Sequence, residues 1–400
     1  MKKALMMSFA IVAALSGETI DEAFNEGKAS GQLRITYVNQ DNAVDIDTYG
    51  TSLGGQLKYE TGRSNNVKLG IAAYISQKIG YATGDEEEGK ANHDLFAANA
   101  KSYAYIGEGY IDYSANDFSL RVGRQLIDTP LADTDDIRMH RNSFEAAIAT
   151  YSGIDKTTLV GGYITRWAGY DSGDDITHFK KLDTADSHGA AIVGILNESV
   201  ENLAVQGWYY GIDNVSNILY TDATYMISVN ELIDAQFSGQ YGYFAEKKSS
   251  AVDGSVYGIA GTFNLGMVSL GAAYNKTIND NGKTIVNGFG GGPYFTSMEE
   301  MSINSMEDAK AYQLSGELDL ASIGIKGLMF SALYGNFKSA PADLNVKEID
   351  LIAAYQISEA FSAEMSYAMI GDKNKNRLND GIHDYDGGYD YFLLRMSYNF

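Results

Sequence analysis

The side chains best suited to chemistry in this sequence are charged groups gathered in one short connection. Positions 125–142 read QLIDTPLADTDDIRMHRN, in which carboxylates, arginines and a histidine lie close together. Charges held near one another attract ions, orient dipolar molecules and disfavour apolar ones. The members of this group are Asp128, Pro130, Asp133, Asp135, Asp136, Arg138, His140 and Arg141. Pro130 stiffens the connection, because its ring fixes one backbone angle.

Basic residues form a second group, spread over segments that alternate like strands. This group consists of Arg34, Lys58, Lys68, Arg121, Arg124 and Arg395. If the first and last segments are neighbours in a closed sheet, the six residues form a positive strip that faces the acidic connection. Two unit charges about 10 Å apart interact by only about 0.4 kcal/mol in water, and low-dielectric walls raise this severalfold. Such facing charges would orient a zwitterion. A simpler hypothesis is that Asp135 and Asp136 pair with Arg138 or Arg124 and only fix the connection.

The last segment, positions 389–400, indicates the kind of element that carries these residues. Its large apolar residues are Phe392, Leu394, Met396, Tyr398 and Phe400, and most residues between them are polar. Strict alternation predicts a strand with one face toward hydrocarbon and one toward water. A chain that ends on an aromatic in such a strand resembles the assembly signal of outer-membrane β-barrel proteins. A spanning strand must also pair along both edges, which predicts pairing with the first strand.

The rest of the chain divides in the same way, into about 18 segments that include the last one. They are predicted at 30–39, 49–60, 67–78, 101–113, 118–124, 143–152, 156–166, 188–196, 203–212, 217–227, 231–243, 253–264, 266–276, 309–319, 326–337, 346–356, 361–371 and 389–400. Short turns such as 114–117 alternate with long polar connections such as 125–142 and 277–308. This arrangement is typical of an all-β transmembrane antiparallel barrel with short periplasmic turns and long extracellular loops.

Composition favours the same class. The 400 residues include 43 Gly, 29 Tyr, 3 Pro and no Cys, and the mean hydropathy is −0.21. Only every second residue of a barrel strand meets lipid, so the mean hydropathy stays low. Aromatic girdles at the membrane interfaces would explain the tyrosines and both tryptophans, Trp167 and Trp208, with a carbohydrate-binding surface as the alternative. The net charge of −22 argues against nucleic-acid binding.

Three segments are predicted along the chain. Residues 1–16 have the charged start, apolar core and small residues of a cleaved signal peptide, which implies export. Residues 17–29 form a periplasmic lead-in with one short helical turn, and residues 30–400 form the barrel. Removing Lys2 and Lys3 with the signal peptide changes the net charge from −22 to about −24.

The charged connection and its flanks resemble a known family. The residues that carry the resemblance are Gly123, Arg124, Gln125, Thr129, Pro130, Asp135, Asp136, Arg138, Met139, Asn142, Phe144, Glu145 and Ala146. Together with the lead-in and the terminal strand they resemble the OprD-type outer-membrane porins, most closely the major outer-membrane porins of Campylobacter-like bacteria. The resemblance implies an 18-stranded barrel in a Gram-negative outer membrane whose third outer loop folds into the lumen and narrows it, with passive diffusion of small hydrophilic solutes.

Further expectations concern selectivity and partners. With a net charge near −24, a preference for cations is expected. His140 and Arg141 depart from the family pattern and are expected to add one fixed positive charge near the narrowest region, and a second at low pH. The expected partners are outer-membrane lipid, the barrel-assembly machinery through the terminal strand, small solutes and a homotrimer, with no nucleic acid.

Other functions receive less support. No histidine lies in a nucleophile motif, so the sequence does not predict an enzyme. An outer-membrane adhesin or surface antigen with long outer loops and little channel activity is the alternative. No cofactor is predicted. Clustered carboxylates at Asp171, Asp174 and Asp175 leave open a calcium site at the outer rim, whereas 372–383 has Arg377 and His383 where a calcium loop needs Gly and Glu.

Overall fold

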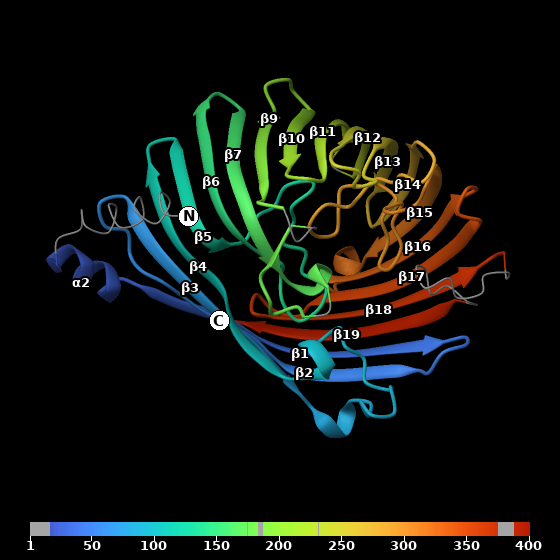
Figure 1. Cartoon of the computed structure of the whole chain (residues 1–400), viewed down its shortest axis with the longest axis horizontal. Helices are drawn as coiled ribbons and strands as arrows, with labels where there is room; N and C mark the ends of the chain where they lie inside the picture. The colour runs from blue at the N-terminus through green and yellow to red at the C-terminus, as the bar shows by residue number, and fades with distance from the viewer. Residues whose placement is uncertain (1–16, 174, 183–186, 231, 375–387) are drawn as a thin grey trace.

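The strands of this chain form one closed antiparallel sheet. The computed structural model describes residues 17–173, 175–182, 187–230, 232–374 and 388–400, so the predicted signal peptide lies outside the described residues. Within these ranges the sheet has 19 strands, and one of them, β8, is only two residues long. The wall is therefore an 18-stranded barrel (Figure 1), which confirms the prediction from sequence.

The bounds of the elements follow chain order. They are α2 (Gly17–Asn25), β1 (Lys28–Asn42), β2 (Thr48–Glu60), β3 (Val67–Lys78), η1 (Gly80–Ala82), η2 (Ala98–Ala100), β4 (Tyr103–Ala115), β5 (Phe118–Gln125), β6 (Ser143–Ile154), β7 (Thr157–Ala168), η3 (Tyr170–Ser172), β8 (Lys180–Lys181), β9 (Ala190–Asn197), β10 (Leu203–Ile212), β11 (Ser216–Asn230), β12 (Ile233–Glu246), β13 (Gly254–Leu265), β14 (Val268–Ile278), β15 (Ala309–Asp319), η4 (Leu320–Ile323), β16 (Leu328–Ser339), β17 (Leu344–Gln356), β18 (Phe361–Asp372) and β19 (Tyr389–Asn399).

The barrel closes where the first strand meets the last. The pairing of β1 with β19 runs from Gln32 opposite Asn399 to Asn42 opposite Tyr389. Gly31 and Phe400 extend it, because each backbone N–H donates to the other's carbonyl oxygen, at 2.9 and 3.0 Å. Hydrocarbon offers no hydrogen-bond partner to a free strand edge, so this seam completes the wall.

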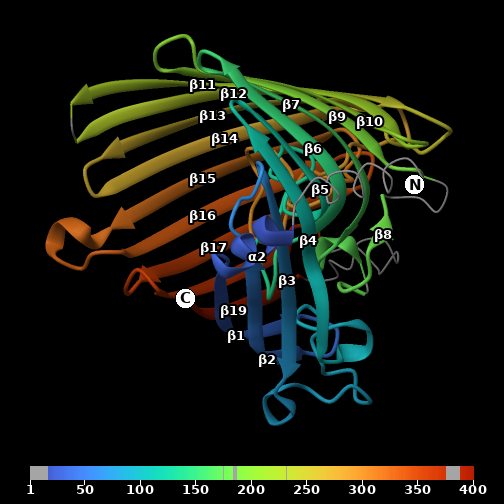
Figure 2. The same ribbon diagram turned by 90° about the vertical axis from the view of Figure 1, so that its left-hand side faces the viewer.

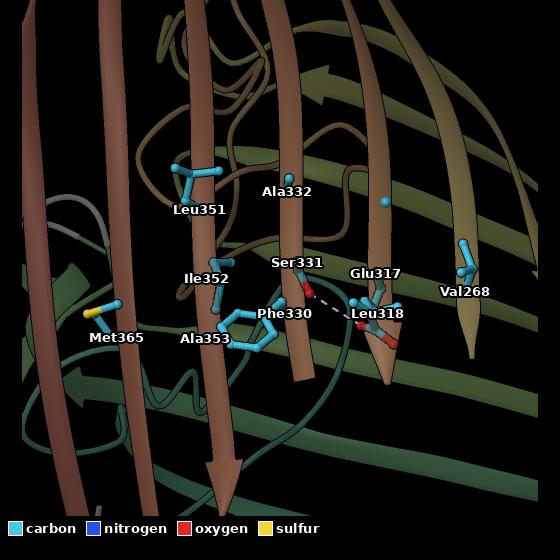
Figure 3. Close-up of a pocket in the computed structure, with 11 residues that line it drawn as sticks. Val268, Glu317, Leu318, Phe330, Ser331, Ala332, Leu351, Ile352, Ala353 and Met365 are labelled. Atoms are coloured by element: carbon cyan, nitrogen blue, oxygen red, sulfur yellow. Dashed lines mark hydrogen bonds between the residues drawn. The ribbon is translucent and has the colours of Figure 1, made fainter. Parts of the chain in front are cut away.

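Side chains alternate between the two faces of the wall. On β1, Leu33 is 59% exposed, whereas the next residue, Arg34, is 4% exposed. The outward face is rich in exposed apolar residues, and on β15–β17 it contains a shallow apolar groove of about 520 Å³ (Figure 3). On β19, Tyr398 and Phe400 are exposed while Ser397 is buried. The apolar face meets lipid and the other face lines the lumen, because a strand in a bilayer can keep charges only where they stay wet or paired.

Both tryptophans lie away from the predicted girdles. Trp167 is 5% exposed and stacks on Phe144, with ring centroids 6.2 Å apart. Trp208 is also 5% exposed and donates to Gln206 from its indole nitrogen. Both side chains belong to the buried core inside the barrel, so their assignment to an interface girdle was wrong. Strand-end position alone does not say which face a residue occupies.

The two ends of the barrel differ. One end has short turns such as 116–117 and 155–156, and the other has long connections, here named L2 (79–102), L3 (126–142), L4 (169–189) and L7 (279–308). The predicted lead-in is the nine-residue helix α2 at the short-turn end, where the N–H of Gly62 donates to Ala23 and α2 lies beside the first strands (Figure 2). No helix among the described residues combines the length and apolar character needed to span a membrane.

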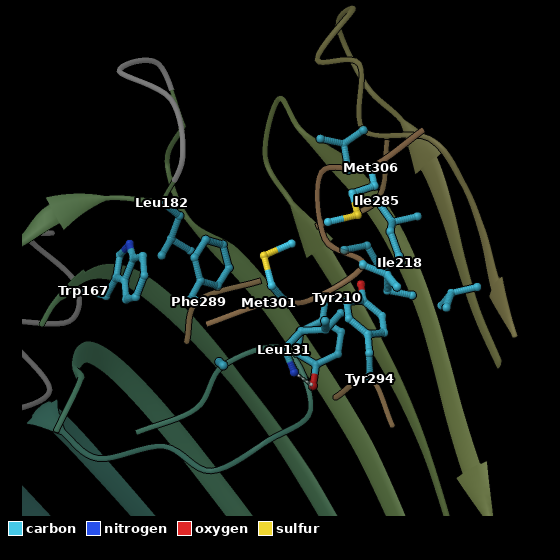
Figure 4. Packing of buried hydrophobic residues seen from close by; sticks show 14 of the residues in the cluster. Leu131, Trp167, Leu182, Tyr210, Ile218, Ile285, Phe289, Tyr294, Met301 and Met306 are labelled. Carbon is cyan, nitrogen blue, oxygen red and sulfur yellow. Dashed lines mark hydrogen bonds between the residues drawn. The ribbon is translucent and has the colours of Figure 1, made fainter. Parts of the chain in front are cut away.

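L3 and L7 fold into the ring of strands instead of projecting from it (Figure 1). Two backbone hydrogen bonds join the loops at Phe289 of L7. Its N–H donates to the carbonyl oxygen of Leu131, and its carbonyl oxygen accepts from the N–H of Asp133, each at 3.0 Å. The N–H of Leu131 donates to the hydroxyl of Tyr210 on β10 at 3.2 Å, and Phe289 lies edge-on to Trp167 with ring centroids 5.6 Å apart. The same buried cluster includes Leu182 and Met301 (Figure 4). Lumen-facing residues of β9–β13 belong to this apolar core. Ion pairs of the wall lie on β1–β5 and on β18 and β19.

Arginine substitutions at two adjacent residues of β17 should differ in their effect on stability, because one residue faces lipid and the other faces the lumen. Leu351→Arg places a charge on the outer face, where Leu351 is 48% exposed, and should lower the free energy of unfolding by about 2 to 4 kcal/mol. Ile352→Arg, directed to the lumen, should cost far less. Urea unfolding in lipid vesicles measures the loss of free energy for each variant. The folded and unfolded barrels are distinguished by their electrophoretic mobility. Equal losses would contradict this assignment of faces.

Candidate functional site

L3 is fastened to the seam of the barrel by Arg34. The guanidinium donates to both carboxylate oxygens of Asp136, at 2.6 and 2.9 Å, and to the carbonyl oxygens of Arg138 and Met139, at 3.0 and 3.2 Å. Its Nε donates to Ser397 on β19 at 3.0 Å. Arg34 is 4% exposed, so its donors serve the structure and not a solute. A planar guanidinium suits this role, because it offers five donors in a fixed geometry.

The neighbouring strand completes this attachment. Arg395 of β19 donates to the backbone carbonyl of Asp136 and to both carboxylate oxygens of Glu364, at 3.1 Å each. Burial opposes ionisation of Asp136, but hydrogen bonds and charge from Arg34, with Arg395 and Arg141 nearby, hold its pKa below the usual value. Asp136 is thus an ionised anchor in direct contact with the basic strip. The sequence predicted a gap of about 10 Å between these charges, or pairing of Asp136 with Arg138 or Arg124. The seam instead brings β1 and β19 under L3 and into contact with Asp136.

Arg138 joins four loops and the last strand. It donates to Glu300 of L7 at 3.0 Å, and its Nε lies 3.7 Å from a carboxylate oxygen of Asp94 in L2. Its guanidinium lies over the rings of Tyr170 in L4 and Tyr391 in β19, 4.5 and 4.7 Å from their centroids. Burial alone would lower the pKa of Arg138, but these four partners raise it above its ordinary value. Arg138 is therefore a permanent cation at the junction of the loops.

L3, L4 and L7 together enclose an acidic cavity of about 380 Å³. Its charged lining consists of Asp133, Asp135, Arg138, Asp171, Glu299 and Glu300. Burial, followed by the charges of Asp171 and Asp133, raises the pKa of Asp135 to about 7. Burial, with Asp94 adding to it against the opposing charge of Arg138, raises the pKa of Glu300 to about 7. Near neutral pH the charge of this cavity therefore depends on pH.

The remaining lining carboxyls shift in the same direction. Burial is the first cause of the raised pKa of Asp133, Asp171 and Glu299, and each also lies near other carboxylates or in their field. Asp171 accepts a hydrogen bond from Asn142 at 2.8 Å, which links L4 to the end of L3. The cavity is thus bounded by carboxyl groups from three separate loops, with Arg138 beside them.

The predicted basic strip lies on the wall, and a carboxylate accompanies each of its members. In addition to Arg34 with Asp136 and Arg395 with Glu364, the pairs are Lys58 with Glu108 at 2.9 Å, Lys68 with Glu60 at 2.8 Å, Arg121 with Asp112 at 3.0 Å and Arg124 with Glu145 at 3.1 Å. The strip is therefore largely neutralised. These four acidic partners were not predicted from the sequence, although their positions on the wet face of alternating strands were a usable signal.

His140 lies against the wall and not in the cavity. Its ring stacks on Tyr74 with centroids 4.8 Å apart, and its Nε2 lies 3.0 Å from the carbonyl oxygen of Ile75. Burial lowers the pKa of His140 to about 4, although the bond to Ile75 opposes the shift. The second positive charge expected at low pH would therefore appear only near or below pH 4. Arg141 is 46% exposed and lies 3.8 Å from Asp136.

The other predicted loop residues lie at the start of L3. Asp128 is exposed and accepts a hydrogen bond from Thr134, and Pro130 occupies a tight turn in which Thr129 and Ala132 exchange backbone hydrogen bonds. Of the eight predicted residues, Asp133, Asp135 and Arg138 line the acidic cavity. Asp136 anchors the loop, and the others support its path.

The contribution of L7 to the cavity was not predicted from the sequence. L7 approaches L3 through Gly288, whose missing side chain leaves room for the carbonyl oxygen of Leu131; a Cβ there would lie 2.3 Å from that oxygen. Gly288, Gly290 and Gly292 all have positive φ, a conformation that favours glycine. The glycine-rich run at 288–292 in a long connection was the available signal for such a close approach.

A metal site receives no support from the described residues. No group of three or more His, Cys, Asp or Glu in the described ranges is arranged to hold a metal ion. Of the predicted calcium cluster, Asp174 lies outside the described residues, and so do Arg377 and His383 of the rejected calcium loop.

The sequence of the chain matches an established family. The profile described as "outer membrane porin, OprD family" matches residues 22–400. The chain belongs to the OprD family of porins. This OprD-family porin is a non-enzymatic channel of the Gram-negative outer membrane, as predicted. Among curated proteins, none matches its sequence significantly.

Solved structures show that the OprD-family fold is shared over nearly the whole length. Pseudomonas aeruginosa OccK9 (OpdG) is 18% identical with a TM-score of 0.79, covering 94% of this chain and 99% of that one. Acinetobacter baumannii OccAB2 is 15% identical with a TM-score of 0.81, covering 95% and 99%. Pseudomonas aeruginosa OpdK, determined with vanillate, is 17% identical with a TM-score of 0.79, covering 94% and 99%.

Removing the anchor of L3 should destabilise the barrel. Arg34→Ala leaves the buried carboxylate of Asp136 without its main partner and should lower the free energy of unfolding by about 3 to 5 kcal/mol. Urea midpoints measure the loss, and proteolysis within L3 reports its release. Lys90→Ala is the control, because Lys90 and Glu88 form an exposed pair, and it should have no measurable effect. A stable Arg34→Ala barrel with protected L3 would overturn the anchoring role.

Proposed function

We propose that this porin conducts small hydrophilic solutes and ions by passive diffusion and prefers cations to anions. The observation that carries the proposal is the acidic cavity formed by L3, L4 and L7, in which five carboxyl groups surround a passage and Arg138 is the only cation among the described lining residues. A constriction lined by like charges between low-dielectric walls concentrates counter-ions.

Two further hollows lie beside L3 or the acidic cavity. A hollow of about 680 Å³ between L2 and L4 contains His93 and Asp94 and shares Tyr170 and Asp171 with the acidic cavity. A further hollow of about 310 Å³ is lined by Arg34, Asp136, Glu364 and Arg395. Because Asp135 and Asp136 line different hollows, L3 separates them. This arrangement supports an outer entrance, a constriction and an exit toward the short-turn end.

The pairing of charges on the barrel wall supports a preference for cations over anions. Its basic residues are paired with carboxylates, so they offer little net positive charge to an anion. Arg121 and Arg124 remain 34% and 37% exposed and could still turn a zwitterion so that its carboxylate faces the wall. The use of L3 and L7 inside the barrel favours a channel over the alternative adhesin or surface antigen, which would display its loops.

Processing and assembly are part of the same proposal. Residues 1–16 act as a cleaved signal peptide, 17–29 are the periplasmic lead-in and 30–400 the porin domain. The terminal strand engages the barrel-assembly machinery through its outward residues, and the porin forms a homotrimer. The pairing of β19 with β1 supports a late role for the terminal strand, because the wall closes only when it is in place.

Removing carboxylates from the cavity should weaken cation preference. The double variant Asp133→Asn with Asp135→Asn should reduce the potassium-to-chloride permeability ratio by about twofold or more, because both groups line the narrow acidic region. Reversal potentials across planar bilayers under a KCl gradient measure it. Asp128→Asn is the matched control and should leave the ratio unchanged. A wild-type channel that favours chloride, or an unaffected double variant, would refute the proposal.

Cation preference should rise between pH 6 and pH 8. The pKa values of Asp135 and Glu300 are raised to about 7, so each group is mostly neutral below that pH and mostly ionised above it. The cavity therefore gains up to two negative charges as pH rises. Reversal potentials at the two pH values test this, and Asp135→Asn should reduce the response by about half. A flat profile in the wild-type channel would show that these groups do not titrate in this range.

A further inference from the structure

The lumen face of β17 carries two buried carboxyl groups. Glu348 and Asp350 are both 0% exposed, and they share a face because residues two apart on a strand point the same way. No Lys, Arg or His among the described residues forms an ion pair with either of them. A carboxyl group so deeply buried needs hydrogen bonds or a proton to be tolerated.

These two groups receive three consecutive backbone N–H groups of L7. Glu348 accepts from Glu300 with one oxygen and from Met301 with the other, both at 2.9 Å. Asp350 accepts from Glu299 with its Oδ2 at 3.4 Å. The barrel wall thus holds L7 by its backbone at the point where Glu299 and Glu300 enter the acidic cavity. This attachment does not depend on which side chains those loop residues carry.

The two carboxyl groups are also within hydrogen-bonding reach of each other. A bond between two carboxyl groups requires a proton, because ionised carboxylates only accept. Both oxygens of Glu348 already accept N–H bonds, whereas Asp350 Oδ1 is buried with no other hydrogen-bond partner among the described residues. One proton shared between Asp350 Oδ1 and Glu348 satisfies both groups.

We propose that Glu348, supported by a proton that it shares with Asp350, positions L7 in the passage and thereby sets where Glu299 and Glu300 lie in the acidic cavity. The proposal deepens the proposed function and rests on it for the role of that cavity. Neither residue touches a solute, because both are fully buried. They act through L7 and are positioning residues.

The residues around Glu348 and Asp350 offer little to balance a second negative charge on the pair. Across the strands, Glu348 and Asp350 face Gly335 and Leu333 of β16 and Ile370 and Ala368 of β18, which carry no charge. The titratable groups that face the pair from L7 are Glu299 and Glu300, and Arg138 of L3 is engaged by Glu300. A second negative charge on the pair would therefore lie beside the carboxyls of Glu299 and Glu300, with the nearby Arg138 already engaged by Glu300. Loss of the shared proton at alkaline pH should loosen L7.

Two isosteric variants distinguish positioning from charge. Glu348→Gln replaces an acceptor oxygen by an amide that points a donor at a backbone N–H, so one attachment is lost. Asp350→Asn keeps a donor toward Glu348 and an acceptor for Glu299, so the attachment is retained. Asp222→Asn is the matched control, because Asp222 is a partly buried lumen carboxyl of β11 whose partners are Gln206 and Tyr220 and not L7.

The position of L7 can be measured by thiol labelling. The chain has no cysteine, so Ser302→Cys introduces one unique thiol into L7, next to Met301. At pH 7 we expect Glu348→Gln to raise the rate of modification by a methanethiosulfonate reagent by about tenfold, the effect of losing one hydrogen bond to a carboxylate. Asp350→Asn and Asp222→Asn should leave the rate unchanged. With the wild-type pair the rate should rise toward pH 10, and Asp350→Asn should abolish this rise.

The labelling rates test the positioning role of Glu348 and the shared proton separately. Equal effects of Glu348→Gln and Asp350→Asn at pH 7, or no effect of Glu348→Gln, would overturn the positioning role. A pH response that survives Asp350→Asn would overturn the shared proton. If Glu348→Gln does not fold, Asp350→Asn and the wild-type pH profile still test the proposal. Labelling rates do not depend on ion selectivity, so a channel without cation preference would refute the proposed function and leave this test intact.

Discussion

The pairing of β1 with β19 is the contact on which the rest of this barrel depends. Hydrocarbon offers no hydrogen-bond partners, so an open edge would leave a row of backbone groups unsatisfied. Closure also brings Arg34 of β1 and Arg395 of β19 side by side, and both bind Asp136. The same last strand supplies Tyr391, which contacts Arg138 and donates to Asp94. The seam of the wall is therefore also the site where the internal loops are attached.

Adjacent carboxylates in L3 have opposite properties for a physical reason. Asp136 lies against two arginines, which hold its pKa low despite burial. Asp135 lies among other carboxyls in a buried site, and its pKa is raised to about 7. The first is a structural anion and the second a titratable group facing the passage. Charge density in a loop is thus a poor guide to function until the partner of each charge is known.

The two sides of the barrel interior differ in polarity. The face of β9–β13 is covered by apolar residues of L3 and L7, which bury Leu131 and Phe289 and hold the loops in place. The opposite wall keeps its charges by pairing them, since an unpaired buried ion is costly. The proposed route of a solute thus lies between an acidic loop surface and a nearly neutral wall. This asymmetry, and not total charge alone, supports the proposed preference for cations.

Much of the architecture was readable from sequence. Period-two alternation predicted all 18 wall strands. Successive residues of a spanning strand face lipid and lumen in turn, so apolar and polar residues alternate in the local sequence. The same parity placed Arg34 and Arg395 on the wet face. The clustering of charges at 128–141 also singled out L3, one of the loops that fold into the ring of strands.

Tertiary structure alone decided how the charges are used. Asp136 pairs with Arg34, 102 positions away, and Arg138 with Glu300, 162 positions away. Such contacts leave no periodic signal, because the loops that make them are irregular and their partners depend on how the ring closes. For the same reason the burial of His140 and the entry of L7 into the lumen were not foreseen. Local alternation determined the wall, whereas long-range packing determined the passage within it.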